Sequence, residues 1–288
     1  MDYPMVVFAL GSAACFGLAL VLTQFGLRDA SPIQGASVSV PSAALIFLVL
    51  SPVTVGLDGW HGGAVAVFAL AGCLFPATVT LLSFEANRRI GPNLTGALGN
   101  LTPLFAVGIA VLMLGEAPSA WQVAGIAVIC VGATALLGVS RQNATAIHAL
   151  AMALPLAAAL IRGLVQPLVK VGLESWPNPF AAVTIGYLVS ATVLVVVGRV
   201  TVRRSPVAFD RRGLRWFIAV GCCNGLAVLG LYAALARGPV TVVAPVVACY
   251  PLATLLFSRL LLGAGELTAR MIFGVVVTVA GVVVLLAT

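Results

Sequence analysis

The sequence predicts an all-α integral membrane protein with ten transmembrane helices, built as two five-helix repeats of inverted topology. Three observations predict this fold class. Hydrophobic residues make up 61% of the 288 residues and charged residues 8%, with a mean hydropathy of +1.16, whereas about a quarter of the residues of a soluble globular protein are charged. Apolar windows of membrane-spanning length, about 20 residues, recur along the whole chain. The two halves also repeat one order of glycine and proline motifs.

Each apolar window is long enough to cross the hydrocarbon core of a bilayer as an α-helix. Almost no residue remains for a domain outside the membrane. The first window follows Asp2 and no Lys or Arg, so we expect a true span and not a cleaved signal peptide. The predicted spans are 3–26, 33–56, 63–86, 91–114, 119–138, 146–170, 179–199, 214–235, 240–262 and 268–287.

An internal repeat divides the chain into two halves, residues 1–140 and 146–288. Each half has a Gly-Pro opening, a Pro-Leu in mid-span, a closing Gly-Glu and two glycines seven residues apart. In the first half these are Gly91-Pro92, Pro103-Leu104, Gly115-Glu116, Gly125 and Gly132. In the second they are Gly238-Pro239, Pro251-Leu252, Gly265-Glu266, Gly274 and Gly281. Because five is odd, two five-span halves insert with opposite orientations, as in many secondary transporters.

The motifs of the first half resemble those of a known family. The pattern G-x-L-x-x-L-x-P-L-x-A spans residues 96–106 and is followed by Gly115-Glu116. It is similar to the ten-helix EamA-like members of the drug/metabolite transporter superfamily. The second half keeps Pro251-Leu252 but lacks the leading glycine. The resemblance covers essentially the full chain and implies a membrane transporter, without indicating its substrate.

Arg162 is the most informative single residue, because it lies near the middle of an apolar stretch. A guanidinium at mid-bilayer costs a few kcal/mol on insertion scales and roughly 10 or more in simulations of an isolated helix. Gln166 and Lys170 follow at helical spacing, so all three side chains share one face. We expect that face to line a cavity between helices that attracts an anionic group. The remaining candidate substrate-binding residues of the chain are Gln24, Glu85, Asn100, Thr102, Tyr187, Tyr232 and Tyr250.

Glu85 is a special candidate because it lies at the end of the third predicted span, deeper than Arg88 and Arg89. Two interpretations stay open for it. It forms a static ion pair with Arg162, or it acts as a gate that substrate opens by breaking that pair.

Prolines and glycines supply further candidates. Pro103 and Pro251 each free a carbonyl in mid-span, so they act as hinges or as static kinks. The glycine pairs allow close backbone approach. The resemblance implies that the last helix of each half joins the two halves, which makes Gly125, Gly132, Gly274 and Gly281 a seam; a homodimer face is the alternative.

The sequence favours a secondary transporter or exporter of a small polar metabolite, anionic or zwitterionic and amino-acid-like, that works by alternating access. Two alternatives remain: a proton-coupled exporter of organic cations or drugs, and a membrane binding or sensor protein that transports nothing. The cation exporters among the superfamily's short relatives use a glutamate in the first span, which here has no acid after Asp2. We expect no enzymatic activity, cofactor or metal, since no catalytic, phosphate-binding or zinc-ligand motif is present.

The distribution of cations predicts the topology and location. Eleven of the 15 Lys and Arg residues fall in connections on the side opposite the termini, and two, Lys170 and Arg237, on the side of the termini. By the positive-inside rule both termini are extracytoplasmic, although family members are commonly drawn with both inside. We expect a multi-pass protein of the cell (inner or plasma) membrane that binds no nucleic acid and is a monomer or weak homodimer. Coupling to protons stays open.

Overall fold

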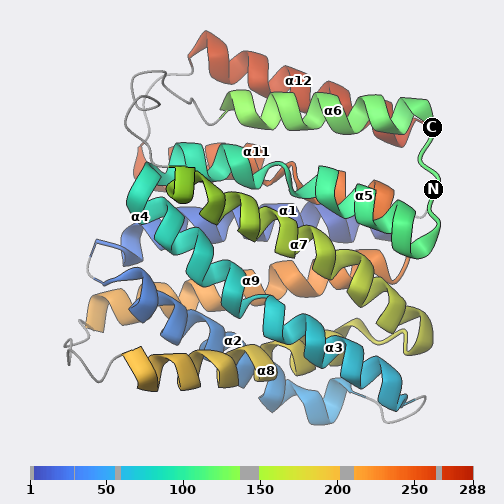
Figure 1. Cartoon of the computed structure of the whole chain (residues 1–288). Helices are drawn as coiled ribbons and strands as arrows, with labels where there is room; N and C mark the ends of the chain where they lie inside the picture. The colour runs from blue at the N-terminus through green and yellow to red at the C-terminus, as the bar shows by residue number, and fades with distance from the viewer. Residues whose placement is uncertain are drawn as a thin grey trace.

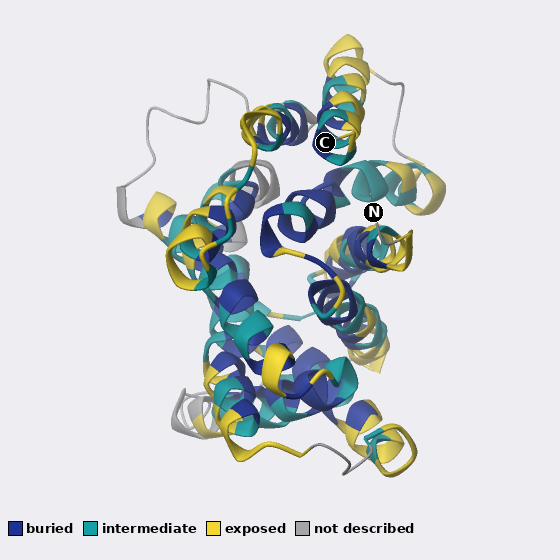
Figure 2. Cartoon of the chain, turned by 90° about the vertical axis from the view of Figure 1, so that its right-hand side faces the viewer, coloured by how far each residue is buried: buried dark blue, intermediate teal, exposed yellow. Residues whose placement is uncertain are grey.

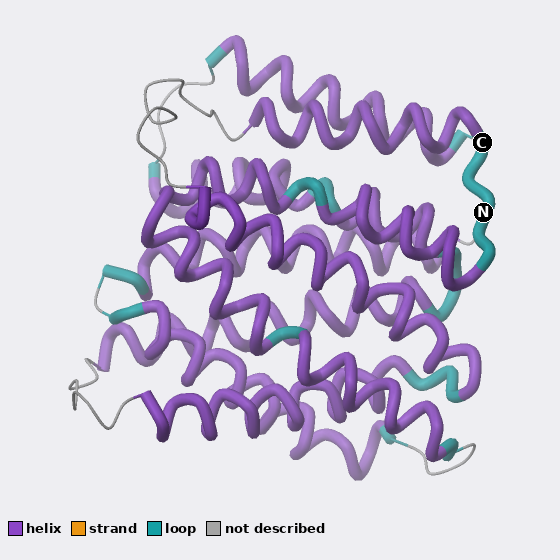
Figure 3. Tube along the Cα trace, in the orientation of Figure 1, coloured by secondary structure: helices purple, strands orange, loops and turns teal. Residues whose placement is uncertain are grey.

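The computed structural model describes residues 3–28, 30–55, 60–136, 149–201, 211–263 and 268–287. Within this part the chain is helical, without strands (Figure 3). Its helices are α1 (Tyr3–Gly26), α2 (Pro32–Thr54), α3 (Gly62–Leu74), α4 (Ala77–Gly99), α5 (Thr102–Leu114), α6 (Ala120–Leu136), α7 (Ala149–Ser175), α8 (Pro179–Thr201), α9 (Arg211–Leu235), α10 (Val240–Val247), α11 (Tyr250–Leu262) and α12 (Ala269–Leu286) (Figure 1).

The prediction of a multi-pass membrane protein is confirmed. In the described residues, 8 helical segments are long and apolar enough to cross a membrane, and two shorter apolar helices cover residues 102–114 and 120–135. Two of the eight segments join neighbouring elements, since 62–86 combines α3 with the start of α4, and 240–262 combines α10 with α11. The chain therefore crosses the bilayer many times.

The expected third span, 63–86, agrees with a candidate span over 62–86, but the structure assigns no loop at the predicted connection to the fourth span. α3 ends at Leu74, a cis Phe75-Pro76 bond follows, and α4 then continues from Ala77 through Gly99, past the predicted connection. Backbone groups within a bilayer must find partners in the protein. The Gly91-Pro92 signal does not end the assigned helix, and helical hydrogen bonding satisfies the amides on either side of it.

Two helices of the predicted plan are interrupted in mid-span. α4 ends at Gly99 and α5 begins at Thr102, while α10 ends at Val247 and α11 begins at Tyr250. Pro103 and Pro251 lie at the second positions of α5 and α11. Proline is tolerated there because amides of a first helical turn have no intrahelical acceptor. The two prolines therefore lie at helix starts and not inside continuous kinked helices.

Helices far apart in sequence pack as pairs. α1 lies against α9 and α11, α2 against α8 and α9, and α7 against α3, α4 and α5. α6 and α12 lie side by side at one edge, seen at the top of Figure 1. Each helix thus contacts partners from the other half of the chain.

Exposed residues lie on the outside of the bundle (Figure 2), and many of them are large and apolar. Val53, Leu112 and Val123 are examples, with 90%, 86% and 52% of their surface accessible. Such a surface would aggregate in water but suits lipid, whose tails are as apolar as leucine. The interior instead holds small residues, and they allow the helices to approach closely. A Cβ on Gly221 would collide with the Ser39 carbonyl of α2.

Candidate functional site

A large cavity of about 1060 Å³ lies among α1, α4, α7, α9 and α11. It reaches both helix interruptions, because Gly99, Thr102 and Pro103 line it on one side and Ala248, Tyr250 and Pro251 on the other. Ligand cavities are typically about 300–1,000 Å³. This one has room for a metabolite together with water.

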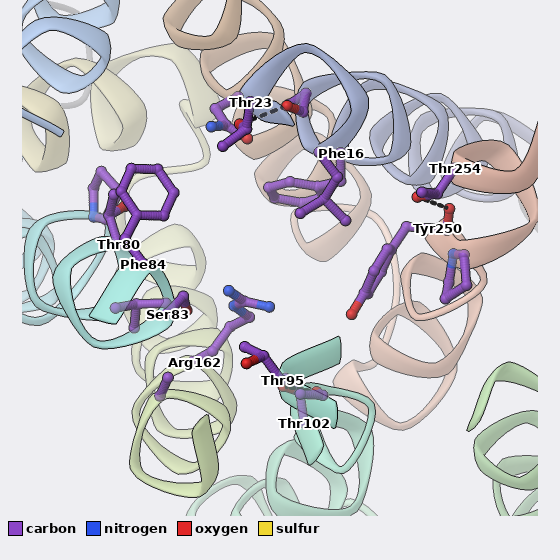
Figure 4. A pocket seen from close by; sticks show the side chains of 18 of the residues that line it. Phe16, Thr23, Thr80, Ser83, Phe84, Thr95, Thr102, Arg162, Tyr250 and Thr254 are labelled. Carbon is purple, nitrogen blue, oxygen red and sulfur yellow. Dashed lines mark hydrogen bonds between the residues drawn. The ribbon is translucent and has the colours of Figure 1, made fainter. Parts of the chain in front are cut away.

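Arg162 projects into this cavity from the middle of α7. Figure 4 shows its guanidinium between Ser83 and Thr95, with the Tyr250 ring across the open space. Its Nε is buried and has no hydrogen-bond partner. Among the described residues no carboxylate lies within ion-pair distance of it. The residue is partly accessible from the cavity, so its guanidinium is available to bind an anionic group there.

Other buried polar groups around the cavity also lack partners. Gln166 is 4% exposed and its Oε1 accepts no hydrogen bond, and the same holds for the hydroxyls of Thr95 and Tyr187. Each of these side chains lines the cavity with Arg162. Buried polar groups in proteins are nearly always paired with protein or water. Their grouping marks the place where a polar ligand or ordered water would complete the hydrogen bonding.

The interruptions point helix N-termini toward the same space. The amides of Thr102 and Tyr250, which begin α5 and α11, have no backbone acceptor among the described residues. The two interruptions face each other, since a Cβ on Gly99 would lie 3.7 Å from the Tyr250 hydroxyl. Helix N-termini carry partial positive charge and favour anions. The helix starts therefore add to the positive potential of Arg162.

The charges lining the cavity have one sign. Of the described residues that line it, Arg28, Arg162 and Arg270 are basic and none is acidic. Arg28 stacks on the Phe25 ring, 5.2 Å from its centroid. The Arg270 Nε donates to the Ala135 carbonyl at 3.2 Å. Both lie at exposed helix ends, so cationic groups extend from the cavity mouth to its centre.

Eight of the residues predicted from sequence line the cavity together. They are Gln24, Thr102, Pro103, Arg162, Gln166, Tyr187, Tyr250 and Pro251. Arg162 and Gln166, predicted to share one helix face, both line this cavity.

Lys170 was expected on the same face but does not line the cavity. Its Nζ donates to the carbonyls of Leu235 and Gly238, at 2.8 and 3.1 Å. Eight helical residues advance roughly 12 Å along the axis. This distance carries Lys170 past the cavity to the corner between α9 and α10.

Glu85 is likewise placed away from Arg162. Its Oε1 accepts from the Arg89 Nε at 2.6 Å, one turn along the same helix and partly exposed. Residues i and i+4 are close neighbours on a helix, so the nearer cation takes the carboxylate. In this structure the described side chains of Arg162 and Glu85 form no ion pair, so neither the static pair nor the unbroken form of the gate is seen.

Asn100 and Tyr232 are buried but do not line the cavity. Asn100 lies in the turn between α4 and α5, 1% exposed, with neither amide atom bonded. The Cys130 thiol donates to its carbonyl at 3.4 Å. Tyr232 is 3% exposed and packs in the apolar core.

The predicted glycines lie between α6 and α12. A Cβ on Gly132 would lie 2.5 Å from the Thr278 amide nitrogen, and one on Gly125 would lie 3.0 Å from the Gly281 carbonyl oxygen. A Cβ on Gly132 would also lie 3.0 Å from the Gly274 carbonyl oxygen. These contacts join the last helices of the two halves within one chain.

Sequence inspection missed several cavity residues. Thr80, Ser83 and Phe84 of α4 follow one another at spacings of three and one, and Thr254 and Ser258 of α11 are four apart. Hydroxyl residues at helical spacing inside apolar spans are a signal of an inward face. A search of each span for that spacing would have found them.

The helical fold, its apolar outer surface and the central cavity define a multi-pass integral membrane protein. The sequence model of the EamA-like transporter family matches residues 3–138 and 149–287, and the chain belongs to this family. It is similar to a protein of known crystal structure at 16% sequence identity and a TM-score of 0.79, over 98% of this chain and 96% of the other. No curated protein sequence matches it significantly. The family is one of membrane transporters.

Proposed function

We propose that the protein is a secondary transporter that moves a small anionic or zwitterionic, amino-acid-like metabolite by alternating access between two inverted five-helix repeats. The observation that carries the proposal is the unpaired Arg162 guanidinium in a cavity lined by three arginines and no described acid. Hydroxyls and amides around it, such as Ser83 and Asn224, are suited to a second, cationic group of a zwitterion.

Mirrored contacts support the inverted repeat. Gly26 of α1 lies against Phe217 of α9, and Gly172 at the matching place in α7 lies against Phe68 of α3. The seam between α6 and α12 and the pair α2 and α8 map onto themselves when the halves are exchanged. In the first half, α3 with the first part of α4 counts as one span, and the rest of α4 with α5 as the next. In the second half, α10 with α11 counts as one span. Each half then has five spans. The two halves can then rock about the central cavity.

The alternative of a cation exporter is disfavoured by charge. Arginine repels an organic cation in a cavity of low dielectric, and the described lining offers no carboxylate to compensate. A binding or sensor protein that transports nothing is distinguished from a transporter only by measuring substrate flux across a membrane.

Ligand stabilisation of the purified protein tests the proposal. A panel of carboxylates, amino acids and phosphorylated metabolites is added in detergent, and thermal unfolding is followed. We expect anionic or zwitterionic compounds to raise the unfolding temperature, because binding to the folded state stabilises it. Stabilisation by cations alone would contradict the proposal.

Topology is predicted by the charge bias. At Thr288 we expect activity from a fused reporter that works outside the cytoplasm and none from one that works inside it. The 199–215 connection is expected to be cytoplasmic. The cavity mouth, marked by Arg28 and Arg270, then faces the cytoplasm. A signal from a cytoplasm-specific reporter at Thr288 would reverse this orientation.

Pro103 and Pro251, which follow the two helix interruptions, give a further prediction. If they let α5 and α11 tilt during access changes, Pro103→Ala and Pro251→Ala restore an amide donor and stiffen the connection to the preceding helix. We expect folded protein with slower flux in proteoliposomes. Wild-type flux in both single variants and in the double variant would make the prolines packing features.

A further inference from the structure

The cavity is open at one end and sealed at the other. At the end where α1 ends and α12 begins it reaches the exposed residues Arg28, Thr268 and Arg270. Toward the end that holds the termini, the last lining residues of α7, α9 and α10 are Gln166, Leu231 and Ala244, exposed by 4%, 3% and 3%. The structure therefore represents one access state, closed on the side of the termini.

The corner between α9 and α10, residues 236–239, lies across the sealed end. Two side chains from other elements hold it. The Lys170 ammonium of α7 donates to Leu235 O at 2.8 Å and to Gly238 O at 3.1 Å. These are carbonyls at the C-terminus of α9, where a cation complements the helix dipole.

Glu116, in the connection between α5 and α6, holds the other side of the corner. Its Oε1 and Oε2 accept from the amides of Val240 and Thr241, each at 2.8 Å. The residue before α10 is Pro239, whose side chain makes no capping bond. A distant carboxylate thus supplies the N-cap of α10, although 124 residues separate Glu116 from Val240.

These bonds join the segments that must part for the cavity to open at this end. Lys170 ties α7 to the corner, and Glu116 ties the first half of the chain to it. Charge-assisted bonds are strong in a dry interior. On opening, water can replace them at both the side chains and the backbone, so release leaves no buried polar group unsatisfied.

We propose that Glu116 and Lys170 form a releasable latch that keeps the terminus-side end of the cavity closed. The latch rests on the proposed function, since a closed end has a role only if it opens in a transport cycle. When the cavity becomes accessible from the terminus side, both side chains leave the corner and are hydrated. Weakening the latch shifts the population toward that state.

Cysteine accessibility tests the latch without any substrate. The six native cysteines are replaced, and Ala244→Cys supplies one buried cavity probe. A membrane-impermeant thiol reagent is applied to the terminus side, using sealed vesicles of both orientations. We expect Glu116→Gln and Lys170→Met each to raise the labelling rate from that side by roughly tenfold or more, as for loss of at least one charge-assisted bond. Glu174→Gln, an exposed acid near the same end of α7, serves as the matched control and leaves the rate unchanged.

A second measurement guards against variants that fold poorly. Glu116→Cys with Thr241→Cys is cross-linked by a short bifunctional thiol reagent with a cleavable disulfide spacer, which locks the corner, and a reductant reverses it. We expect flux to stop when the pair is cross-linked and to return on reduction, while labelling of the Ala244→Cys probe from the open end persists. Unchanged terminus-side labelling in folded variants, or full flux through the locked protein, would overturn the latch. Raised labelling without flux of any anion would contradict the proposed function but leave the latch standing.

Discussion

Replacing Arg162 with alanine is expected to abolish ligand binding and transport while the protein still inserts and folds. The guanidinium is the one described charge in the middle of the cavity, and it offers two donors in a fixed fork to a carboxylate or phosphate. Two such hydrogen bonds contribute about 1.5–3 kcal/mol each. Their loss weakens binding by at least roughly 100-fold. Calorimetry with the stabilising ligand and flux in proteoliposomes measure both effects.

Two controls separate this role from a structural one. Arg162→Lys keeps the charge but loses the fork, and we expect it to recover only part of the affinity. Arg89→Ala removes a cation that pairs with Glu85 at the surface of α4, and it is expected to leave binding unchanged. Wild-type transport in Arg162→Ala, or in Arg162→Ala combined with Glu85→Ala, would rule out a substrate-binding role.

The second large effect is expected at the seam between α6 and α12. Gly132→Leu places a side chain where even a Cβ would be 2.5 Å from the Thr278 amide nitrogen and side-chain hydroxyl. Overpacking of this kind costs about 1–3 kcal/mol and occasionally more. We expect a lower unfolding temperature in detergent and a smaller monodisperse fraction in size-exclusion chromatography.

Val131→Leu is the matched control, because Val131 lies next to Gly132 but is 60% exposed on the lipid side. It should leave stability unchanged. If Gly132→Leu altered only the oligomeric state and not the stability of the monomer, the glycines would serve a dimer face and not the intramolecular seam.

The sequence was sufficient to predict the multi-pass helical fold and the central arginine. Both depend on local signals: window hydropathy and a charge in the middle of a span. Lys170 shows the limit of periodicity, which fixes the direction of a side chain around the helix but not whether the cavity extends that far along the axis. Glu85 shows that a nearby cation on the same helix outcompetes a distant one.

Other features depend on long-range contacts that no local pattern reveals. The role of Glu116 requires that the α5–α6 connection meet the start of α10. The burial of Asn100 requires the interruption after Gly99, and Tyr232 faces the core because α9 packs against both α1 and α2. Hydropathy windows also do not detect the two helix interruptions, because the residues on both sides of each interruption are apolar.

The central claim is that a fixed positive charge in the cavity selects the substrate. Counterflow in proteoliposomes, with matched compounds that differ only in charge, tests it most directly: a carboxylate, its neutral amide and a cationic amine of the same skeleton. We predict exchange of the carboxylate or zwitterion, little exchange of the amide, and none of the cation, with the preference lost in Arg162→Ala. Exchange of the cation at the rate of the carboxylate, unchanged in Arg162→Ala, would contradict the account.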